Sequence, residues 1–245
     1  MAALELINTT LYNDANLVAY YQLENASHTK VGTDLTNTGS VTFDAGKFNN
    51  CAEFGANNTT KSLSTSGTPV TFAQAHTAWT MLAWVNPNAS GGISNTGFIA
   101  GLQVSDGSFR LTFPLETENS SNGNITFAVF DGVSNPYNTG QALSTGTWQM
   151  LTWGYDGSNM FVYYNATNVL NQARSLNLTG SASSATGFGI GCNNEGSIGS
   201  QFSGQIDDFA VFSRALSSTE ISNHFNGLDG LPAPKGGTIS LMGVG

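Results

Sequence analysis

The segment Phe202–Phe225 constrains the fold more than any other part of the chain. Its first half carries apolar residues that suit a strand, namely Ile206, Phe209, Val211 and Phe212. Ser217 can cap a following helix, and Glu220, three residues later, can return a hydrogen bond to the cap. Gly227 suits the end of that helix. The segment therefore predicts a long strand that completes a sheet, followed directly by a short helix.

The composition favours strands and loops over helices. Charged residues make up only 9% of the chain, whereas hydrophobic residues reach 40% and aromatic residues 11%. A chain this apolar does not have the composition of a disordered protein, and its 245 residues can bury a sizeable core. That length is ordinary for a single all-β sandwich domain.

The charge distribution argues against two classes of partner. The net charge is −9, and the seven Lys and Arg residues are scattered along the sequence. Without a basic patch, binding to nucleic acid or to an anionic membrane surface is not expected. No apolar run approaches the roughly 18 residues of a transmembrane helix, so membrane insertion is not expected either.

The chain contains two cysteines, Cys51 and Cys192. They are too far apart in sequence for a zinc site made of cysteines alone. Either they form a disulfide in an oxidising compartment, or they are small buried apolar residues. The sequence leaves both alternatives open, because it does not give the distance between them.

Several motifs resemble the laminin-G-like jelly rolls of the concanavalin A-like lectin/glucanase superfamily. The closing segment fits the pattern G-x-I-D-[DE]-x-x-[IV]-[FY]-x-R-A-L-S-x-x-E-I at Gly204–Ile221. The strand Leu17–Leu23 resembles the family's opening strand, with Tyr21 in place of the usual Trp. Thr77–Asn86 and Thr147–Asp156 resemble two further family strands. The resemblance covers most of the chain and is specific for the fold, although the fold hosts many functions.

This resemblance implies an all-β, two-sheet antiparallel jelly-roll sandwich with a short C-terminal helix. The jelly roll is expected to span residues 17–228. Residues 1–16 form an N-terminal leader, and residues 229–245 form a Pro/Gly linker with a β-prone tail. Both ends are candidates to dock either on their own domain or on an assembly partner.

The resemblance also implies a structural calcium ion near the first and last strands. Calcium prefers carboxylate, amide and carbonyl oxygens. The matching acidic positions are Glu24, Asp34 and one of Asp207 or Asp208. The alternative is that Asp207 accepts hydrogen bonds from loop amides with no ion present.

Glycan-binding sites commonly use aromatic rings and Asn side chains. Here the candidates are Trp84, Trp148, Asn193 and Asn194. The family's alternation would place Trp153 in the core between the sheets and leave Trp84 and Trp148 on the opposite face. For these tryptophans, packing in a buried or half-buried position is the favoured alternative.

The sequence shows no catalytic constellation. Retaining glucanases of the superfamily carry alternating carboxylates on one strand, and the chain has no such triplet. Asp207 and Asp208 are adjacent, so on a regular strand they would point to opposite faces and would not act as a pair. The histidines show no metal-ligand spacing. We therefore expect a protein that is not an enzyme.

The leading functional hypothesis is a non-enzymatic binding module that recognises glycans or a partner surface outside the cell. The first sixteen residues lack the basic and apolar regions of a secretory signal. A second hypothesis is therefore a structural or decorating protein of a virus or phage particle, in a capsid or tail. A glycosidase is the third. These readings predict an extracellular or virion-associated location.

Overall fold

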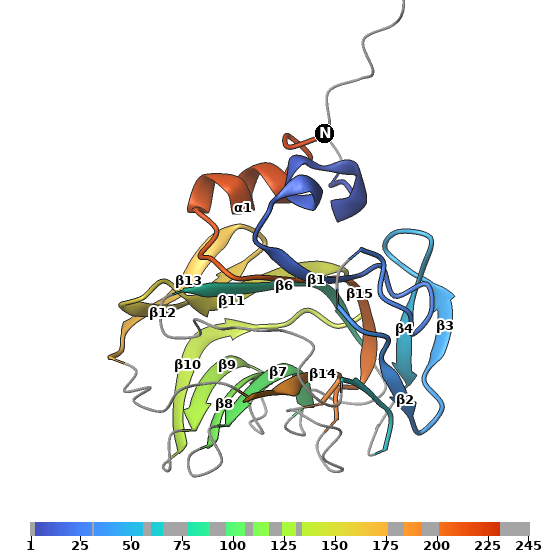
Figure 1. Ribbon diagram of the computed structural model, residues 1–245, viewed down its shortest axis with the longest axis horizontal. Coiled ribbons are helices and arrows are strands. Elements are labelled where there is room, and N and C mark those ends of the chain that lie inside the picture. Colours follow the sequence, from blue (N-terminus) through green and yellow to red (C-terminus); the bar gives the residue numbers. More distant parts are fainter. Residues whose placement is uncertain are drawn as a thin grey trace, which may run out of the picture.

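The computed structural model describes residues 3–30, 32–55, 60–65, 78–88, 97–105, 110–117, 124–130, 134–175, 184–192 and 201–230. Two antiparallel sheets lie face to face, and a short helix lies beyond one of them (Figure 1). This arrangement confirms the predicted jelly-roll sandwich with a C-terminal helix. Among the residues so described, no helix has the length and apolar content needed to cross a membrane.

The larger sheet has eight strands, which are β1 Leu17–Tyr21, β3 Thr42–Ala45, β4 Asn50–Gly55, β6 Trp79–Pro87, β11 Gln149–Tyr155, β12 Asn159–Tyr164, β13 Thr167–Ala173 and β15 Gly204–Phe212. Their order is β13-β12-β11-β6-β15-β4-β3, and β1 also pairs with β15. The closing strand β15 therefore lies inside the sheet, where it contacts three neighbours. This position explains why its sequence is so strongly constrained.

The smaller sheet has seven strands, which are β2 Thr36–Thr38, β5 Ser62–Ser64, β7 Gly97–Ser105, β8 Arg110–Thr117, β9 Asn124–Phe130, β10 Ser134–Ala142 and β14 Ser184–Ile190. Their order is β10-β9-β8-β7-β14-β5-β2. The neighbours β5 and β14 are far apart in sequence, as are β6 and β15 in the other sheet. These long-range pairings hold the chain together as one domain.

The main core lies between the two sheets. The strand β6 runs between β11 and β15 and is buried on both faces, as its apolar sequence predicts. Trp79 and Trp153 are fully buried in this core. Leu151 and Tyr155 join Trp153 there, which confirms the alternation expected for β11.

A smaller core covers the outer face of the eight-stranded sheet. The 3-10 helices η1 (Leu6–Asn8) and η2 (Thr10–Asn13) and the helix α1 (Ser218–Phe225) lie over this face (Figure 1). Leu6, Leu11 and Ile221 are buried against it. Residues 3–16 of the leader therefore dock on their own domain. The tail at 231–245 lies outside the described residues.

The helix α1 has the ends that the sequence predicts. The Ser217 hydroxyl accepts a hydrogen bond from the Glu220 amide at 3.2 Å, and the Glu220 carboxylate accepts one from the Ser217 amide at 2.8 Å. Gly227 has a φ of +65°, and its amide donates to the His224 carbonyl at 3.1 Å. The capping box and the glycine stop are both confirmed.

The strand β15 contains a bulge that the sequence did not reveal. Its pairing with β6 shifts register after Asp207, and Asp208 has a φ of +54°. Ile206 and Phe209 both lie in the main core, so two residues separate these inward-facing positions. Both acids accept hydrogen bonds from residues that belong to, or pack against, the smaller core. The expectation that Asp207 and Asp208 point to opposite faces is therefore wrong.

Candidate functional site

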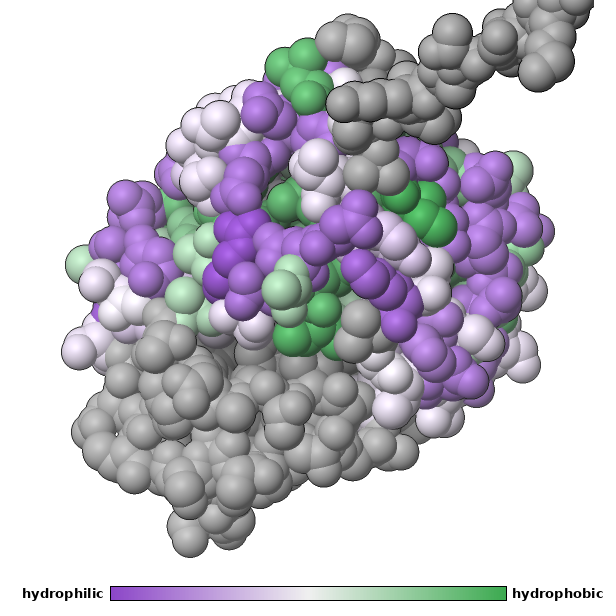
Figure 2. Space-filling model, turned by 45° about the horizontal axis from the view of Figure 1, so that its top comes forward, coloured by the Kyte–Doolittle hydropathy of each residue, from purple (hydrophilic) through white to green (hydrophobic). Residues whose placement is uncertain are grey.

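A pocket of about 270 Å³ lies where the leader meets α1. It is lined by Thr10, Leu11, Asn13, Asp14, Arg214, Glu220, Asn223 and Asp229. Three segments supply these walls: the turn η2, the link between β15 and α1, and the helix with the residues after it. On the face shown in Figure 2, hydrophilic residues (purple) surround smaller hydrophobic patches (green). Seven of the eight residues that line the pocket have polar or charged side chains, and the pocket is built from both ends of the jelly roll.

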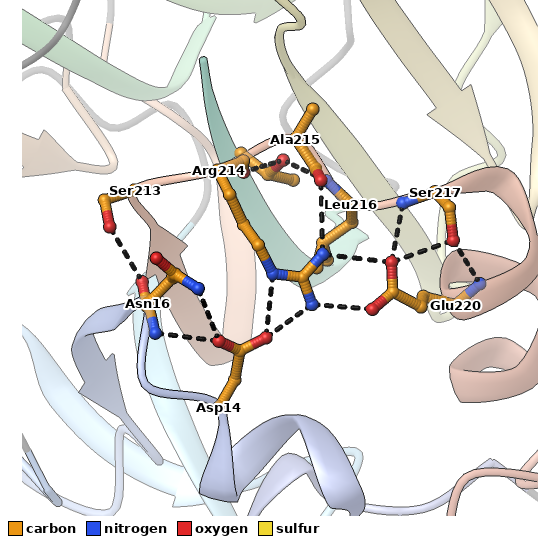
Figure 3. A network of polar contacts seen from close by, with 9 residues as sticks. Asp14, Asn16, Ser213, Arg214, Ala215, Leu216, Ser217 and Glu220 are labelled. Atoms are coloured by element: carbon orange, nitrogen blue, oxygen red, sulfur yellow. Dashed lines mark hydrogen bonds and ion pairs between the residues drawn. The ribbon is translucent and has the colours of Figure 1, made fainter. Parts of the chain in front are cut away.

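Arg214 is the centre of the pocket's hydrogen-bond network (Figure 3). Its Nε donates to Asp14 Oδ2 at 2.8 Å, and its Nη2 forms an ion pair with the same carboxylate. Two further bonds reach Glu220, from Nη1 to Oε2 at 3.0 Å and from Nη2 to Oε1 at 2.6 Å. The rigid guanidinium fork suits two carboxylates at once. Arg214 therefore ties the leader to the first turn of α1.

The charges of this network are fixed by its hydrogen bonds. The bond from Arg214 lowers the pKa of Glu220 to about 2, although burial acts in the opposite direction. Burial also acts to raise the pKa of Asp14, but hydrogen bonds from Arg214 and Asn16 overcome it and lower the pKa. Both carboxyl groups therefore stay ionised near neutral pH. Neither is suited to donate a proton as a general acid.

A second buried pair lies beside the pocket. His224 is fully buried, and its Nδ1 lies 3.0 Å from Asp229 Oδ2. The other carboxylate oxygen, Asp229 Oδ1, is buried and has no hydrogen-bond donor among the described residues. The Thr10 amide donates to the Asp229 carbonyl at 2.8 Å, and Thr9 forms an isolated β-bridge with Gly230. The leader and the residues after α1 are therefore joined at this wall.

The two tryptophans that were predicted to contact a glycan do not line the pocket. Trp84 is only 2% exposed and stacks on Phe225 in the smaller core, with ring centroids 5.9 Å apart. Trp148 is half-buried against the same core. Both tryptophans therefore pack against the smaller core, which was the alternative to glycan contact. They lie on the face opposite Trp153, as the strand alternation predicted. Asn193 and Asn194 lie outside the described residues.

Two of the predicted calcium ligands meet at one loop, between β3 and β4. Asp207 Oδ2 accepts a hydrogen bond from the Phe48 amide at 2.9 Å. Both Glu24 carboxylate oxygens lie 3.2 Å from the Asn50 amide nitrogen. A Cβ at Gly46 would lie 2.7 Å from Asp207 Oδ2, so the loop closes over this carboxylate only because residue 46 is glycine. Asp207 Oδ1 is buried and has no donor among the described residues.

The other two predicted calcium ligands have different partners. Asp34 accepts a hydrogen bond from the His28 amide at 3.0 Å, and its carboxylate pairs with the His28 ring. Asp208 is fully buried and accepts bonds from the Leu6 amide and the Tyr20 hydroxyl. Within the described ranges, no three His, Cys, Asp or Glu side chains are arranged to hold a metal ion. Only Glu24 and Asp207 are therefore brought to a common loop, and the calcium site stays a prediction.

Cys51 and Cys192 are both buried and do not form a disulfide with each other. Burial is the first cause that raises the pKa of the Cys51 thiol, to about 12, and nearby carboxylates add to it. A thiol with so high a pKa is a poor nucleophile near neutral pH. The structure therefore selects the alternative in which Cys51 and Cys192 are small buried residues.

Sequence reasoning did not identify the pocket. Arg214 and Glu220 belong to the R-A-L-S-x-x-E motif, which indicated the fold but not a site. Asp14 lies in the leader, 200 residues from Arg214. No local pattern signals such a contact. The one available signal was Arg214 itself, because a guanidinium carries five donors and the single carboxylate of the motif, Glu220, does not satisfy all of them.

The two stacked sheets, their strand order and the capped closing helix define a concanavalin A-like jelly roll. The family model Laminin_G_3, described as the concanavalin A-like lectin/glucanases superfamily, matches residues 55–222. Since this match covers more than half of the chain, the protein belongs to that family. A search of curated proteins found no match.

Solved structures share the fold at low sequence identity. Domain 4 of AbnA, a GH43 extracellular arabinanase from Geobacillus stearothermophilus, was solved in complex with arabinotriose and is 16% identical, with a TM-score of 0.67, covering 85% of this chain and 98% of that chain. The binding domain of botulinum neurotoxin DC, in complex with rat synaptotagmin II, is 13% identical with a TM-score of 0.60, covering 87% of this chain and 52% of the toxin domain.

A further binding domain has the same relationship to the chain. The binding domain of Paraclostridial Mosquitocidal Protein 1 is 14% identical with a TM-score of 0.60, covering 86% of this chain and 52% of that domain. The chain thus spans about half the length of these two binding domains. At these identities the likeness establishes the fold, which is one used by binding domains.

Proposed function

We propose that the protein is a non-catalytic module that binds a glycan in the pocket between the leader and α1. The observation that carries this proposal is the set of polar and charged side chains that line the pocket, which Arg214 holds in a fixed geometry through two carboxylates. Sugar hydroxyls both donate and accept hydrogen bonds, so they suit walls of mixed carboxylate, amide and hydroxyl groups. A rigid site loses little entropy when the ligand binds.

The relatives support a binding role of this kind. The arabinanase domain was solved with arabinotriose, which makes a glycan the first ligand class to test. The neurotoxin domain was solved with synaptotagmin II, so recognition of a protein surface is the alternative. We favour the glycan because the pocket, at about 270 Å³, is the size of a small-molecule site and not of a protein interface.

The acid–base state of the pocket supports a non-catalytic role. A glycosidase needs one carboxylic acid that protonates the leaving group and a second carboxylate that acts as nucleophile or base. In the pocket, the Arg214 bonds keep Asp14 and Glu220 ionised, with the pKa of Glu220 at about 2. Neither carboxyl group has the raised pKa that a catalytic acid requires.

A glycan array on the purified protein tests this function, with calcium and again with a chelator. We expect a defined set of glycans to bind, and the double variant Asn13→Ala/Asn223→Ala to weaken that binding at least about tenfold, since two neutral hydrogen bonds are lost. Asn168→Ala, at an exposed position of β13 outside the pocket, is the matched control and should bind as the parent does. An array without signal in both conditions would contradict the proposal.

We also propose that a structural calcium ion lies at the β3–β4 loop, held by Glu24 and Asp207. The buried and unpartnered Asp207 Oδ1 supports this assignment, because a cation would compensate for its missing donor. Burial raises the pKa of Asp207 to about 8, and a bound cation would favour the ionised form instead. Calcium at about 100 times its Kd should stabilise the fold by about 2.7 kcal/mol.

Thermal melting with calcium and with chelator measures this effect. Asp207→Asn should abolish the calcium-dependent rise in Tm. Asp34→Asn is the control, because Asp34 bonds to His28, and it should keep the rise. An identical Tm for the parent protein in calcium and in chelator would rule the ion out.

We also propose that the protein acts outside a cell or on a virus particle. Detection in purified virions, compared with culture supernatant, distinguishes a role in a particle from secretion.

A further inference from the structure

We propose that the pocket selects a glycan that carries a free, positively charged amine. This inference rests on the proposed glycan-binding function and specifies its ligand class. The site would therefore prefer an amino sugar to a neutral sugar of the same shape. Three observations lead to this preference: the charge of the pocket, an unpartnered carboxylate oxygen in its wall, and the full engagement of Arg214.

The first observation is the charge balance of the lining. Asp14, Glu220 and Asp229 are acidic, and Arg214 is the one base among the lining residues. The lining residues therefore carry a formal excess of two negative charges. The chain as a whole is also negative, at −9, so its field attracts a cation from a distance as well.

The second observation is the unpartnered oxygen of Asp229. This residue is only 9% exposed, and His224 contacts its Oδ2. Its Oδ1 is buried and, within the part of the chain that the structure describes, has no donor. A buried carboxylate oxygen without a donor is costly, and a cation held in the adjoining pocket lowers this cost through its field, without a direct contact to Oδ1.

The third observation is that Arg214 has little left to offer a ligand. Its Nε, Nη1 and Nη2 groups all donate to protein oxygens, on Asp14, Glu220 and the Ala215 carbonyl. The guanidinium therefore holds the pocket together and does not present a free fork to an anionic sugar. An anionic ligand would face the carboxylates without a free cation among the lining residues.

The remaining walls suit the uncharged part of an amino sugar. Thr10, Asn13 and Asn223 offer a hydroxyl group and two amides, which can pair with ring hydroxyls. An ammonium group brings three donors on one atom, which matches a wall that is rich in acceptors. The volume of about 270 Å³ favours one sugar residue inside the pocket, with the rest of a chain outside.

The test is calorimetric titration of the purified protein at low salt. The probes are a trisaccharide of β-1,4-linked glucosamine and its fully N-acetylated counterpart, which has the same skeleton without the charge. We expect the free amine form to bind about ten- to a hundredfold more tightly, as a charged hydrogen bond predicts. Raising the salt concentration should weaken the binding of the free amine form and leave that of the acetylated form unchanged.

Charge variants at position 223 locate the effect in the pocket. Asn223→Asp adds an acid of nearly the same size and should tighten binding of the free amine form. Asn223→Lys adds a competing cation and should abolish it, whereas Asn168→Lys, at an exposed site outside the pocket, should not. Asp229→Asn should remove most of the preference for the amine. If that variant fails to fold, Asn223→Asp and Asn223→Lys still test whether the amine binds in this pocket.

The two failures can be told apart. Equal affinity for the free and the acetylated trisaccharide, both lowered by Asn223→Lys, would overturn the charge selectivity and leave the glycan-binding function intact. Binding of neither probe, together with a glycan array without signal, would overturn both. Amine-dependent binding that Asn223→Lys does not alter would place the site elsewhere and overturn the assignment to this pocket.

Discussion

The Leu6 amide donates a hydrogen bond of 2.9 Å to Asp208 Oδ2, although 202 residues separate the two along the chain. The same carboxylate accepts the Tyr20 hydroxyl at 2.5 Å through its Oδ1. The bulge in β15 turns Asp208 toward the smaller core and so brings its carboxylate within reach of both donors. One buried side chain thus fixes the leader, the first strand and the last strand together.

We expect Asp208→Ala to release the leader from the sheet. The variant leaves the Leu6 amide and the Tyr20 hydroxyl without acceptors, which costs about 1–3 kcal/mol for each buried group. Urea denaturation measures the loss in free energy of unfolding, and limited proteolysis reports whether cleavage near residues 3–16 becomes faster. Asp208→Asn keeps one acceptor oxygen and should lose less. Unchanged proteolysis in the alanine variant would show that the leader is held by its apolar contacts alone.

The stability of the calcium-free protein should fall as the pH rises from about 4 to 8. Burial raises the pKa of Asp207 to about 8 and that of Asp208 to about 6, above the value of about 4 in an unfolded chain. The folded state therefore binds more protons than the unfolded state across this range, so the free energy of unfolding decreases with pH. The slope approaches about 1.4 kcal/mol per pH unit for each group that titrates.

The variant Asp207→Asn isolates this effect. Without the ionisable group, the upper part of the decline, between pH 6 and 8, should disappear in denaturation curves recorded with chelator. Glu220, whose pKa is about 2, affects stability only in acid below this window, since its contribution is lost as the pH falls below the unfolded value of about 4. A parent protein and variant with parallel pH profiles would refute the assignment.

Replacing Ala166 by glycine should stabilise the protein. Asn165 and Ala166 connect β12 to β13 with φ values of +45° and +66°, a conformation that costs an L-residue with a Cβ about 1 kcal/mol. Ala166→Gly relieves this strain, against a small loss of packing on the smaller core. We expect a net gain of about 0.5–1 kcal/mol in thermal or urea denaturation. A loss of stability would show that the packing of the alanine methyl group outweighs the strain.

Two variants of Glu220 separate its charge from its capping role. Glu220→Gln keeps the group that caps α1 and removes the ion pair with Arg214, so we expect a loss of about 0.5–1 kcal/mol that shrinks in high salt. Glu220→Ala removes both and should lose about 1 kcal/mol more. Helix content by circular dichroism and denaturation at two salt concentrations measure the two effects. Equal losses in both variants would mean that the cap contributes nothing.

Most of the framework could be predicted from the sequence, because the relevant signals are local. The motif at Thr77–Asn86 indicated the strand β6, and the Ser217–Glu220 pair indicated the start of α1. Two edge strands, β10 and β13, were not predicted. Both carry few alternating apolar residues, and β10 contains Pro136 and Gly140, which usually mark turns. In β13 every side chain is exposed or half-buried, because the strand lies at the margin of the core, so its sequence need not be apolar.

The candidate site was much less predictable. Its central contact joins Asp14 to Arg214, and nothing local to either residue specifies the other. The bulge at Asp208 also broke the alternation that sequence reasoning assumed, which reversed the expected direction of one acid. Trp84, in contrast, kept its predicted face, but that face is covered by α1 and the leader. Which residues remain open to a ligand therefore depends on how the chain ends fold back.

The bridge between Thr9 and Gly230 brings the leader and the residues after α1 together at one point of the jelly roll. A domain whose two ends meet in this way can be inserted into a loop of a host protein without stretching either partner. The same geometry permits circular permutation: a short linker can join the old ends, and new ends can open at an exposed turn such as Asp156–Ser158, between β11 and β12. The polar pocket beside the bridge would then lie next to the junction with the host, where fusion to another protein would alter ligand access first.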